Sequence, residues 1–126
     1  MRILLDSHVA LWWLDDSAAM GPRCRELIEL ADEAFISAVT PWELGIKRAL
    51  GKLTMPDGLV DELESKGFVS LSIMAAHAEL APVLPPHHRD PFDRMLVAQA
   101  KLEALVLVTA DKALVSYDVE RFDARS

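Results

Sequence analysis

The sequence predicts an α/β fold in which helices cover both faces of a central, mostly parallel sheet. Short apolar runs recur along the chain, and each is followed by a segment with helix signals such as a capping residue, an early Pro or a closing Gly. Strands that alternate with helices in this way form parallel sheets. No linker, low-complexity tract or repeat interrupts the 126 residues, so we expect one domain over 1–126.

The apolar runs define a sheet of four or five strands. Within residues 2–6, the apolar run Ile3-Leu4-Leu5 ends at Asp6, as expected for a strand that is buried on both faces. Phe68 to Ser72 alternates and is rich in residues that favour strands. The predicted strands are residues 2–6, 34–37, 68–72 and 105–109, and residues 119–123 would add a fifth strand at the edge.

Capping residues, prolines and glycines define the helices. Asp6 or Ser7 caps the first helix. In Thr40-Pro41-Trp42-Glu43, a capping Thr, Pro at the first helical position and an acid three residues after the cap predict a capping box. The predicted helices are residues 7–14, 22–31, 40–51, 56–66, 73–81, 90–103 and 111–116, with an ordered, proline-rich loop at 82–91.

The composition is apolar and acidic. The chain is 52% hydrophobic with a mean hydropathy of +0.18, which allows a real core and an additional apolar face for a partner. Trp12 and Trp13 are adjacent on the first predicted helix and cannot easily both face inward, which favours a partner or dimer surface there. The net charge of −7 argues against simple nucleic-acid binding but is compatible with a metalloenzyme whose acids are offset by bound cations.

Cysteine usage and the N-terminus limit the class of protein further. Cys24 is the only cysteine, which excludes an intramolecular disulfide and a Cys-based zinc site. Only a three-residue apolar run follows Arg2, so we expect no signal peptide, and no stretch approaches the roughly 20 apolar residues of a membrane helix. We therefore expect a soluble, cytoplasmic protein without a membrane partner.

Four acids occupy equivalent local positions although they are spread over most of the chain. Asp6 and Asp111 each follow an apolar run, whereas Glu43 and Asp93 each lie three residues after a predicted helix cap. An acid in the first turn of a helix gains roughly 0.3–1 kcal/mol from the helix dipole without any function. Capping is therefore the better interpretation of Glu43 or Asp93 taken alone, and Asp90 is interpreted as a cap only.

The joint pattern of these acids predicts a metal site. The carboxyl ends of parallel strands meet at one edge of the sheet, which is where ligands bind in open α/β folds. Several carboxylates at that edge would repel one another and raise at least one pKa unless a cation is bound. Because Mg²⁺ and Mn²⁺ prefer oxygen ligands, the sequence indicates a metal-dependent hydrolase.

Hydroxyl and basic residues next to these acids are candidates for substrate binding. Ser7 and Thr109 could bind a phosphate oxygen or a metal-bound water, although local bonding to the backbone is an equally good interpretation. Arg94 and Lys112 immediately follow two of the acids and are the better candidates for holding a phosphate backbone.

The histidines receive structural interpretations. His87 and His88 lie in the proline-rich loop, where exposed histidines are usual, so exposure is favoured over a role as metal ligand or base. His8 and His77 lie on predicted helices and are interpreted as packed or capped.

Four segments follow one another along essentially the whole chain and carry a specific pattern: Leu4–Trp13, Ile36–Leu44, His88–Ala100 and Leu107–Asp111. The most specific is the stretch that begins at His88 and includes Asp90-Pro91-Phe92-Asp93-Arg94. Together these segments resemble PIN domains, and in particular the VapC-like toxins of type II toxin–antitoxin systems.

This resemblance implies a PIN-like three-layer α/β/α sandwich and a Mg²⁺- or Mn²⁺-dependent ribonuclease. The family's four acids fall on Asp6, Glu43, Asp93 and Asp111, and its site hydroxyl falls on Ser7 or Thr109. It also implies a cognate antitoxin that wraps the toxin and blocks the site, and a homodimer.

We therefore predict an endoribonuclease that acts as a toxin and hydrolyses RNA phosphodiesters with a metal-activated water. Asp6, Asp93 and Asp111 would hold the metal, and Glu43 would complete or orient the shell. The alternative is a non-catalytic or non-toxin PIN-like domain that binds or processes nucleic acid.

Two other classes that use acids at strand ends fit less well. A phosphoryl-accepting receiver domain needs an Asp at the end of a central strand, but the second and third predicted strands end in Ser37 and Ser72. A phosphatase of the haloacid-dehalogenase type needs Asp-x-Asp after the first strand, where this chain has Asp6-Ser7-His8.

Overall fold

One sheet of five parallel strands lies at the centre of the computed structural model, which describes all residues from 1 to 126. The strand order is β3-β2-β1-β4-β5, and each neighbouring pair is parallel. This confirms the predicted α/β fold, including the additional strand at the edge. The strands are β1 Arg2–Leu5, β2 Glu33–Ser37, β3 Val69–Leu71, β4 Val106–Thr109 and β5 Arg121–Asp123.

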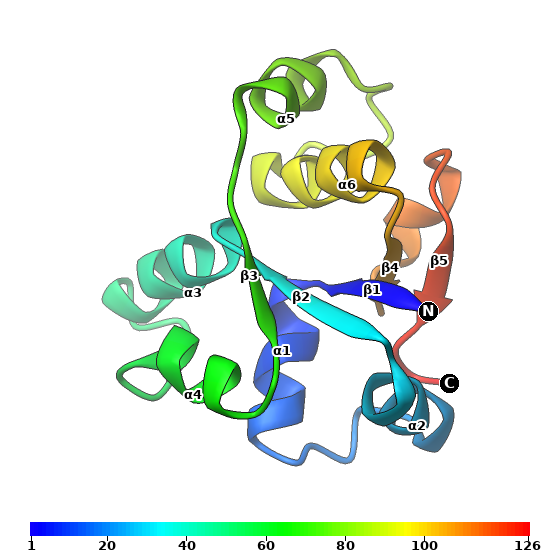
Figure 1. Cartoon of the computed structure of the whole chain (residues 1–126). Coiled ribbons are helices and arrows are strands. Elements are labelled where there is room, and N and C mark those ends of the chain that lie inside the picture. Colours follow the sequence, from blue (N-terminus) through cyan, green and yellow to red (C-terminus); the bar gives the residue numbers. More distant parts are fainter.

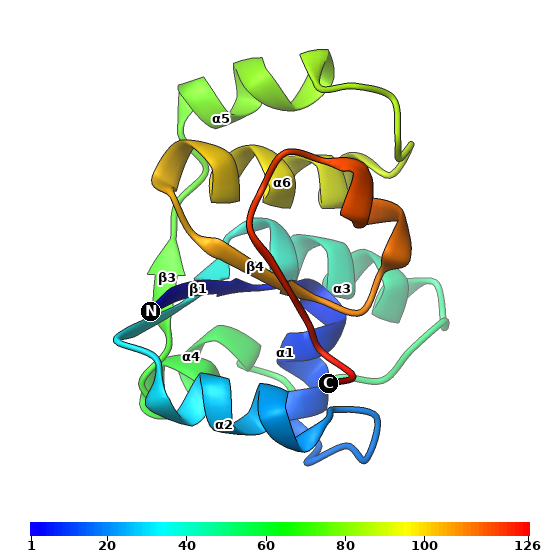
Figure 2. The same cartoon turned by 90° about the vertical axis from the view of Figure 1, so that its right-hand side faces the viewer.

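Helices cover both faces of this sheet (Figures 1 and 2). One layer contains α1, α2 and α4, the opposite layer contains α5 and α6, and α3 packs against α1 and α6 beside the carboxyl ends of the strands. None of the helices combines the length and the apolar character that crossing a membrane requires. The helices are α1 Ser7–Leu14, α2 Pro22–Leu30, α3 Val39–Ala49, α4 Leu59–Ser65, α5 Ala75–Leu80 and α6 Pro91–Glu103, with short 3₁₀ helices η1 Ala81–Val83 and η2 Lys112–Ser116.

The two faces of the sheet contribute to two separate hydrophobic cores. Leu4 and Leu107 point into the core beneath α6, whereas Ile3, Leu5 and Val108 point into the core shared with α1, α2 and α4. All five side chains are fully buried. Successive side chains of a strand alternate between faces, so a run that is apolar at every position is what a sheet covered on both sides requires.

The strand order places a topological switch point between β1 and β4. The chain leaves β1 toward β2 and β3 on one side, whereas β4 and β5 lie on the other side. In open parallel sheets, the crevice at the carboxyl ends of the two strands at this point is the usual place for a ligand. Asp6, which directly follows β1, lies there, and its N–H donates to the carbonyl of Val108 at 3.0 Å.

The start of α3 differs from the prediction. The helix begins at Val39, with Ala38 as N-cap, so Pro41 is its third residue and Thr40 is not a cap. The hydroxyl of Ser37 accepts the Val39 N–H at 3.0 Å and turns the chain into the helix directly after β2. The predicted capping box is therefore wrong, and Pro is tolerated because N–H groups of the first turn have no partner within the helix.

The exposed tryptophan is also not one of the predicted pair. Trp12 and Trp13 are both half-buried, and arginine side chains lie over their rings, with Arg125 at 5.0 Å from Trp12 and Arg25 at 5.8 Å from Trp13. Trp13 also packs edge-on against Phe68. The tryptophan that reaches solvent is Trp42 on α3, whose exposed fraction is 61%.

Candidate metal centre

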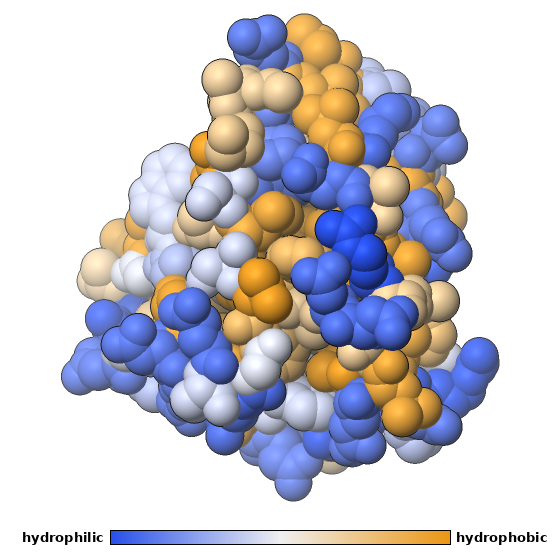
Figure 3. Space-filling model, viewed as in Figure 1, coloured by the Kyte–Doolittle hydropathy of each residue, from blue (hydrophilic) through white to orange (hydrophobic).

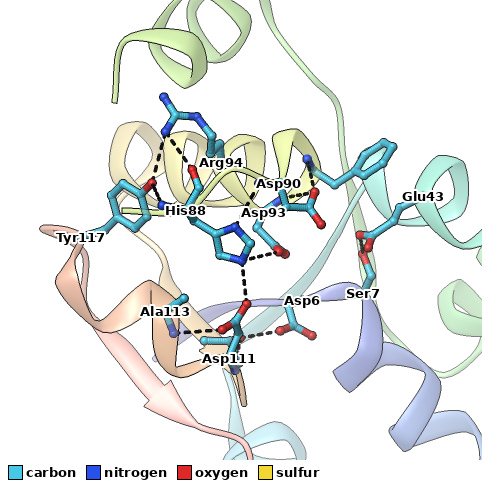
Figure 4. Close-up of polar contacts among 12 residues, drawn as sticks. Asp6, Ser7, Glu43, His88, Asp90, Asp93, Arg94, Asp111, Ala113 and Tyr117 are labelled. Carbon is cyan, nitrogen blue, oxygen red and sulfur yellow. Dashed lines mark hydrogen bonds and ion pairs between the residues drawn. The ribbon is translucent and has the colours of Figure 1, made fainter. Parts of the chain in front are cut away.

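The four predicted acids converge at the carboxyl edge of the sheet (Figure 4). Asp6 follows β1, and Asp111 lies two residues beyond β4 as the N-cap of η2. Asp93 lies in the first turn of α6, and Glu43 projects from α3. The charges of Glu43 and Asp6 both act on Asp93, and His88 lies between Asp93 and Asp111, so all four acids are connected.

Asp6 is held by hydrogen bonds to both of its carboxylate oxygens. Its Oδ1 accepts the Val9 N–H at 2.9 Å as the cap of α1, and its Oδ2 accepts the hydroxyl of Thr109. The same Thr109 oxygen accepts the backbone N–H of Asp111 at 3.0 Å. Burial raises the pKa of Asp6, although the bonds from Thr109 and Val9 oppose that shift. Thr109 thus connects the ends of β1 and β4.

Glu43 is buried and fully engaged rather than capping its helix. Its side chain is 2% exposed; Oε1 accepts the Ser7 hydroxyl at 2.7 Å, and Oε2 accepts the Lys47 ammonium at 2.7 Å. Ser7 also lies 3.1 Å from the Thr40 hydroxyl. A serine has one hydroxyl proton, which Ser7 gives to Glu43, so Thr40 donates to Ser7. We call Asp6 and Glu43, with the hydroxyls of Ser7, Thr40 and Thr109, the buried half of the site.

The remaining two acids meet around a histidine. His88 Nε2 lies 2.9 Å from Asp111 Oδ2 and 3.1 Å from Asp93 Oδ2. The exposed side-chain fractions are 19% for His88, 18% for Asp93 and 38% for Asp111, far above the 2% of Glu43. We call these three residues the open half of the site.

The pKa of Asp93 is raised to about 7. Burial is the largest cause, followed by the negative charges of Asp90 and Glu43, whereas His88 acts in the opposite direction. Asp90 contributes because it caps α6, where its Oδ1 accepts the Phe92 N–H at 2.8 Å. A carboxyl group that titrates near neutral pH is what crowded acids produce when no cation offsets their charge.

The side chains present fit a hard divalent cation. Asp93, Asp111 and His88 offer potential ligand atoms that lie within 4.8 Å of one another. The carboxylate of Asp6 adds further oxygen donors from the end of β1. Oxygen donors with an excess of negative charge suit Mg²⁺ or Mn²⁺ better than a soft metal.

Comparison with known proteins agrees with this geometry. Residues 3–120 match the family described as PIN domain. The chain belongs to the PIN domain family. Ribonuclease VapC22 of Mycobacterium tuberculosis is 31% identical over 122 residues, which cover 91% of each protein. Two solved structures with the same fold are VapBC2 from Rickettsia felis bound to a promoter DNA fragment and DNA-bound VapBC from Salmonella typhimurium. Their TM-scores are 0.71 and 0.69, their identities 14% and 16%, and each alignment covers 98% of both chains.

The sequence did not predict three residues that contact the site acids or their hydroxyls in this PIN domain: His88, Thr40 and Lys47. His88 was expected to be an exposed loop residue, but it is half-buried between two acids. A loop position has no periodicity that predicts the direction of its side chain. The sequence signals for His88 were its place two residues before the Asp90 cap and its position at the start of the His88–Ala100 segment.

Arg94 and Lys112 have different surroundings although both follow a site acid. The Arg94 guanidinium is engaged by Tyr117 and by the 82–88 segment, which gives Arg94 a structural role. Lys112 is exposed beside Asp111. Substrate binding by either residue stays a prediction, and the surroundings favour Lys112. The carbonyl oxygens that accept from Arg94 belong to Pro82, Leu84, Pro85 and His88.

Proposed function

We propose that this PIN domain is a Mg²⁺- or Mn²⁺-dependent endoribonuclease that acts as the toxin of a type II toxin–antitoxin system. The observation that supports this most strongly is the gathering of four acids at the switch point between β1 and β4. The relative that matches over 91% of the chain is named a ribonuclease, and the solved structures with this fold include toxin–antitoxin complexes. The substrate class is therefore RNA.

In this proposal Asp6, Asp93 and Asp111 hold the cation. When bound, the cation offsets charge on the phosphoryl oxygens and lowers the pKa of a water molecule that attacks the phosphorus. The pKa of Asp93 is about 7, so its carboxyl group is partly protonated at neutral pH, and a bound cation would favour its charged form.

The buried half orients this set of ligands. Ser7 and Lys47 fix both oxygens of Glu43, so its carboxylate has one direction toward the site. Thr109 and the Val9 N–H together fix both oxygens of Asp6. We assign these hydroxyls to the support of the acids, and we assign contact with the RNA phosphate to exposed Lys112.

The proposed protein partners are a cognate antitoxin and a second copy of the chain. Three exposed apolar residues follow one another at intervals of four: Trp42 and Ile46 on α3, and Leu50 at its C-cap. Beside Trp42, an apolar cavity of about 280 Å³ extends to Phe92 and Met95 on α6. Apolar residues also reach the surface over α5 and near β3 (Figure 3). Such exposed apolar area supports a protein interface.

The test of function compares the wild type with Asp93→Asn and with Asp61→Asn, which changes an exposed acid in the first turn of α4 that takes part in none of the contacts of the site. End-labelled RNA pools are incubated with Mg²⁺, with Mn²⁺ and with EDTA, and each protein is expressed alone from an inducible promoter while growth is followed. We expect cleavage and growth arrest for the wild type and Asp61→Asn only. Cleavage without growth arrest would reject the toxin role, and equal cleavage by Asp93→Asn would reject the site.

A further inference from the structure

The His88 ring is fixed by contacts to both of its nitrogens. Nδ1 accepts the backbone N–H of Asp90 at 3.0 Å. Nε2 faces the Oδ2 atoms of Asp111 and Asp93 (Figure 4). Three segments that are separate in the sequence therefore meet at this ring: the loop before α6, its first turn, and the turn after β4.

These contacts determine where the proton of His88 lies. A backbone N–H only donates, so Nδ1 must accept and carries no proton. A neutral imidazole has one N–H, which must then be on Nε2, where it donates to the two carboxylates. To bind a cation through Nε2, the ring would have to move its proton to Nδ1 and lose the bond from Asp90.

We propose that His88 is a positioning residue, which holds Asp93 and Asp111 by a shared N–H rather than binding the cation itself. The inference rests on the proposed cation site and assigns one of its residues. Oδ1 of Asp111 accepts the Ala113 N–H at 2.9 Å, so the donor from His88 fixes the second oxygen of that carboxylate. For Asp93, the shared N–H fixes Oδ2.

The backbone of His88 is held from two other elements, which is unusual for a surface loop. Its N–H donates to the hydroxyl of Tyr117 at 3.0 Å, and its carbonyl accepts from Arg94 at 3.2 Å. Arg94 also donates to Tyr117 at 3.3 Å. Further bonds from Arg94 fix the carbonyls of Pro82, Leu84 and Pro85. Arg94 and Tyr117 thus set the position of the His88 ring through their bonds to the His88 backbone.

The direct test is the tautomer of His88 in the ¹⁵N-labelled full chain, measured by long-range ¹H–¹⁵N correlation without cation and with saturating Mg²⁺. We expect a protonated Nε2 and an unprotonated Nδ1 in both states. A shift of the proton to Nδ1 on addition of Mg²⁺ would overturn the proposal, because Nε2 would then be a ligand.

Substitutions separate positioning from general support of the fold. His88→Leu removes the donor at similar volume, and we expect Mg²⁺ affinity to fall by about 10-fold to 100-fold, as for other residues that orient metal ligands. His88→Gln can return an N–H toward the same place and should recover most of this loss. Equal losses in both variants, with unchanged melting temperatures, would contradict a donor role.

Substitutions of Arg94 and Tyr117, which hold the backbone of His88, provide a second test. Arg94→Lys keeps the charge but loses the planar set of donors, and Tyr117→Phe loses the hydroxyl. Both substitutions should weaken Mg²⁺ binding, measured by calorimetry, by a smaller factor than His88→Leu. Wild-type affinity in both variants would reject the proposal that Arg94 and Tyr117 act on the cation site through His88. Because tautomer and Mg²⁺ affinity are read without RNA, absence of RNA cleavage would reject the proposed function and leave this inference standing.

Discussion

In the buried half of the site, Asp6 and Glu43 receive hydroxyl, amide and ammonium donors on all four oxygens. In the open half, Asp93 and Asp111 share one histidine and keep more contact with solvent. The buried half is assembled by the fold, because its donors lie on α1, α3 and β4. The open half depends on a loop and on the first turn of α6.

This difference indicates a division of roles. Buried carboxylates with full sets of donors are rigid and costly to disturb. The pKa of Asp93 is about 7, so its carboxyl group gains or loses a proton readily near neutral pH. We expect the buried half to govern stability and the open half to govern the binding of the cation.

The largest expected effect is the loss of activity in Asp93→Asn. Cleavage should fall by at least about 100-fold, because a charged ligand of the cation is lost. Stability without cation should be unchanged or higher at pH 7, since burial and acidic neighbours disfavour the charge of Asp93. Cleavage assays and thermal unfolding in EDTA measure both effects, and an unfolded Asp93→Asn would mean that the open half also supports the fold.

The second effect is a dependence of stability on pH. The folded pKa of Asp93 is raised from 3.8 to about 7, so its contribution to stability is fully present below about pH 4 and is lost as the pH rises through 7. The loss is about 1–3 kcal/mol, given about 1.4 kcal/mol per pKa unit and partial exposure. Unfolding in EDTA from pH 4 to 8 measures it.

Asp93→Asn serves as the control for this pH dependence. The slope between pH 4 and 7 should be smaller in the variant than in the wild type, and identical slopes would show that another group is responsible. Mg²⁺ should reduce the slope in the wild type, because the cation binds the charged form.

The third effect concerns the buried half. Thr109→Val removes the donor to Asp6 and the acceptor of the Asp111 N–H, so we expect a destabilisation of about 1–3 kcal/mol. Thr109→Ser keeps the hydroxyl and should lose less. Urea unfolding of the three proteins measures these costs. A larger cost for Ser than for Val would mean that packing of the methyl group, which Val keeps and Ser lacks, outweighs the hydrogen bond to Asp6.

The smallest effect is expected for Lys47→Met. Burial lowers the pKa of Lys47, but the hydrogen bond and charge of Glu43 raise it overall. Removal of the ammonium leaves Glu43 without a counter-charge and should cost about 1 kcal/mol without cation. Added Mg²⁺ should restore part of the stability that Lys47→Met loses, as measured by its unfolding curve. No recovery would mean that Glu43 does not contribute to the cation site.

The same two halves show how far the sequence alone can predict the site. The convergence of Asp6, Asp93 and Asp111 follows from strand ends and a helix start, which local patterns reveal. Glu43 was located correctly but for the wrong local reason, because Ser37 starts α3 before Thr40.

Features that depend on packing between distant segments were not predictable. His88 faces its acids because Tyr117 and Arg94 hold the loop, and neither bond has a local sequence signal. Trp12 and Trp13 are half-buried because arginines from α2 and the C-terminus lie over their rings, and a partner surface at this pair stays a prediction. Local rules determine where an element begins; which side chain covers another depends on tertiary contacts.

The most direct test of a single cation site built from both halves is Mg²⁺ calorimetry in buffers of different ionisation enthalpy, which counts the protons released on binding. At pH 7 we expect about half a proton from Asp93 per cation, falling toward zero by about pH 8.5, and weak binding without release in Asp93→Asn. Binding that releases no proton between about pH 6 and 8, or equal affinity in Asp93→Asn, would contradict the account.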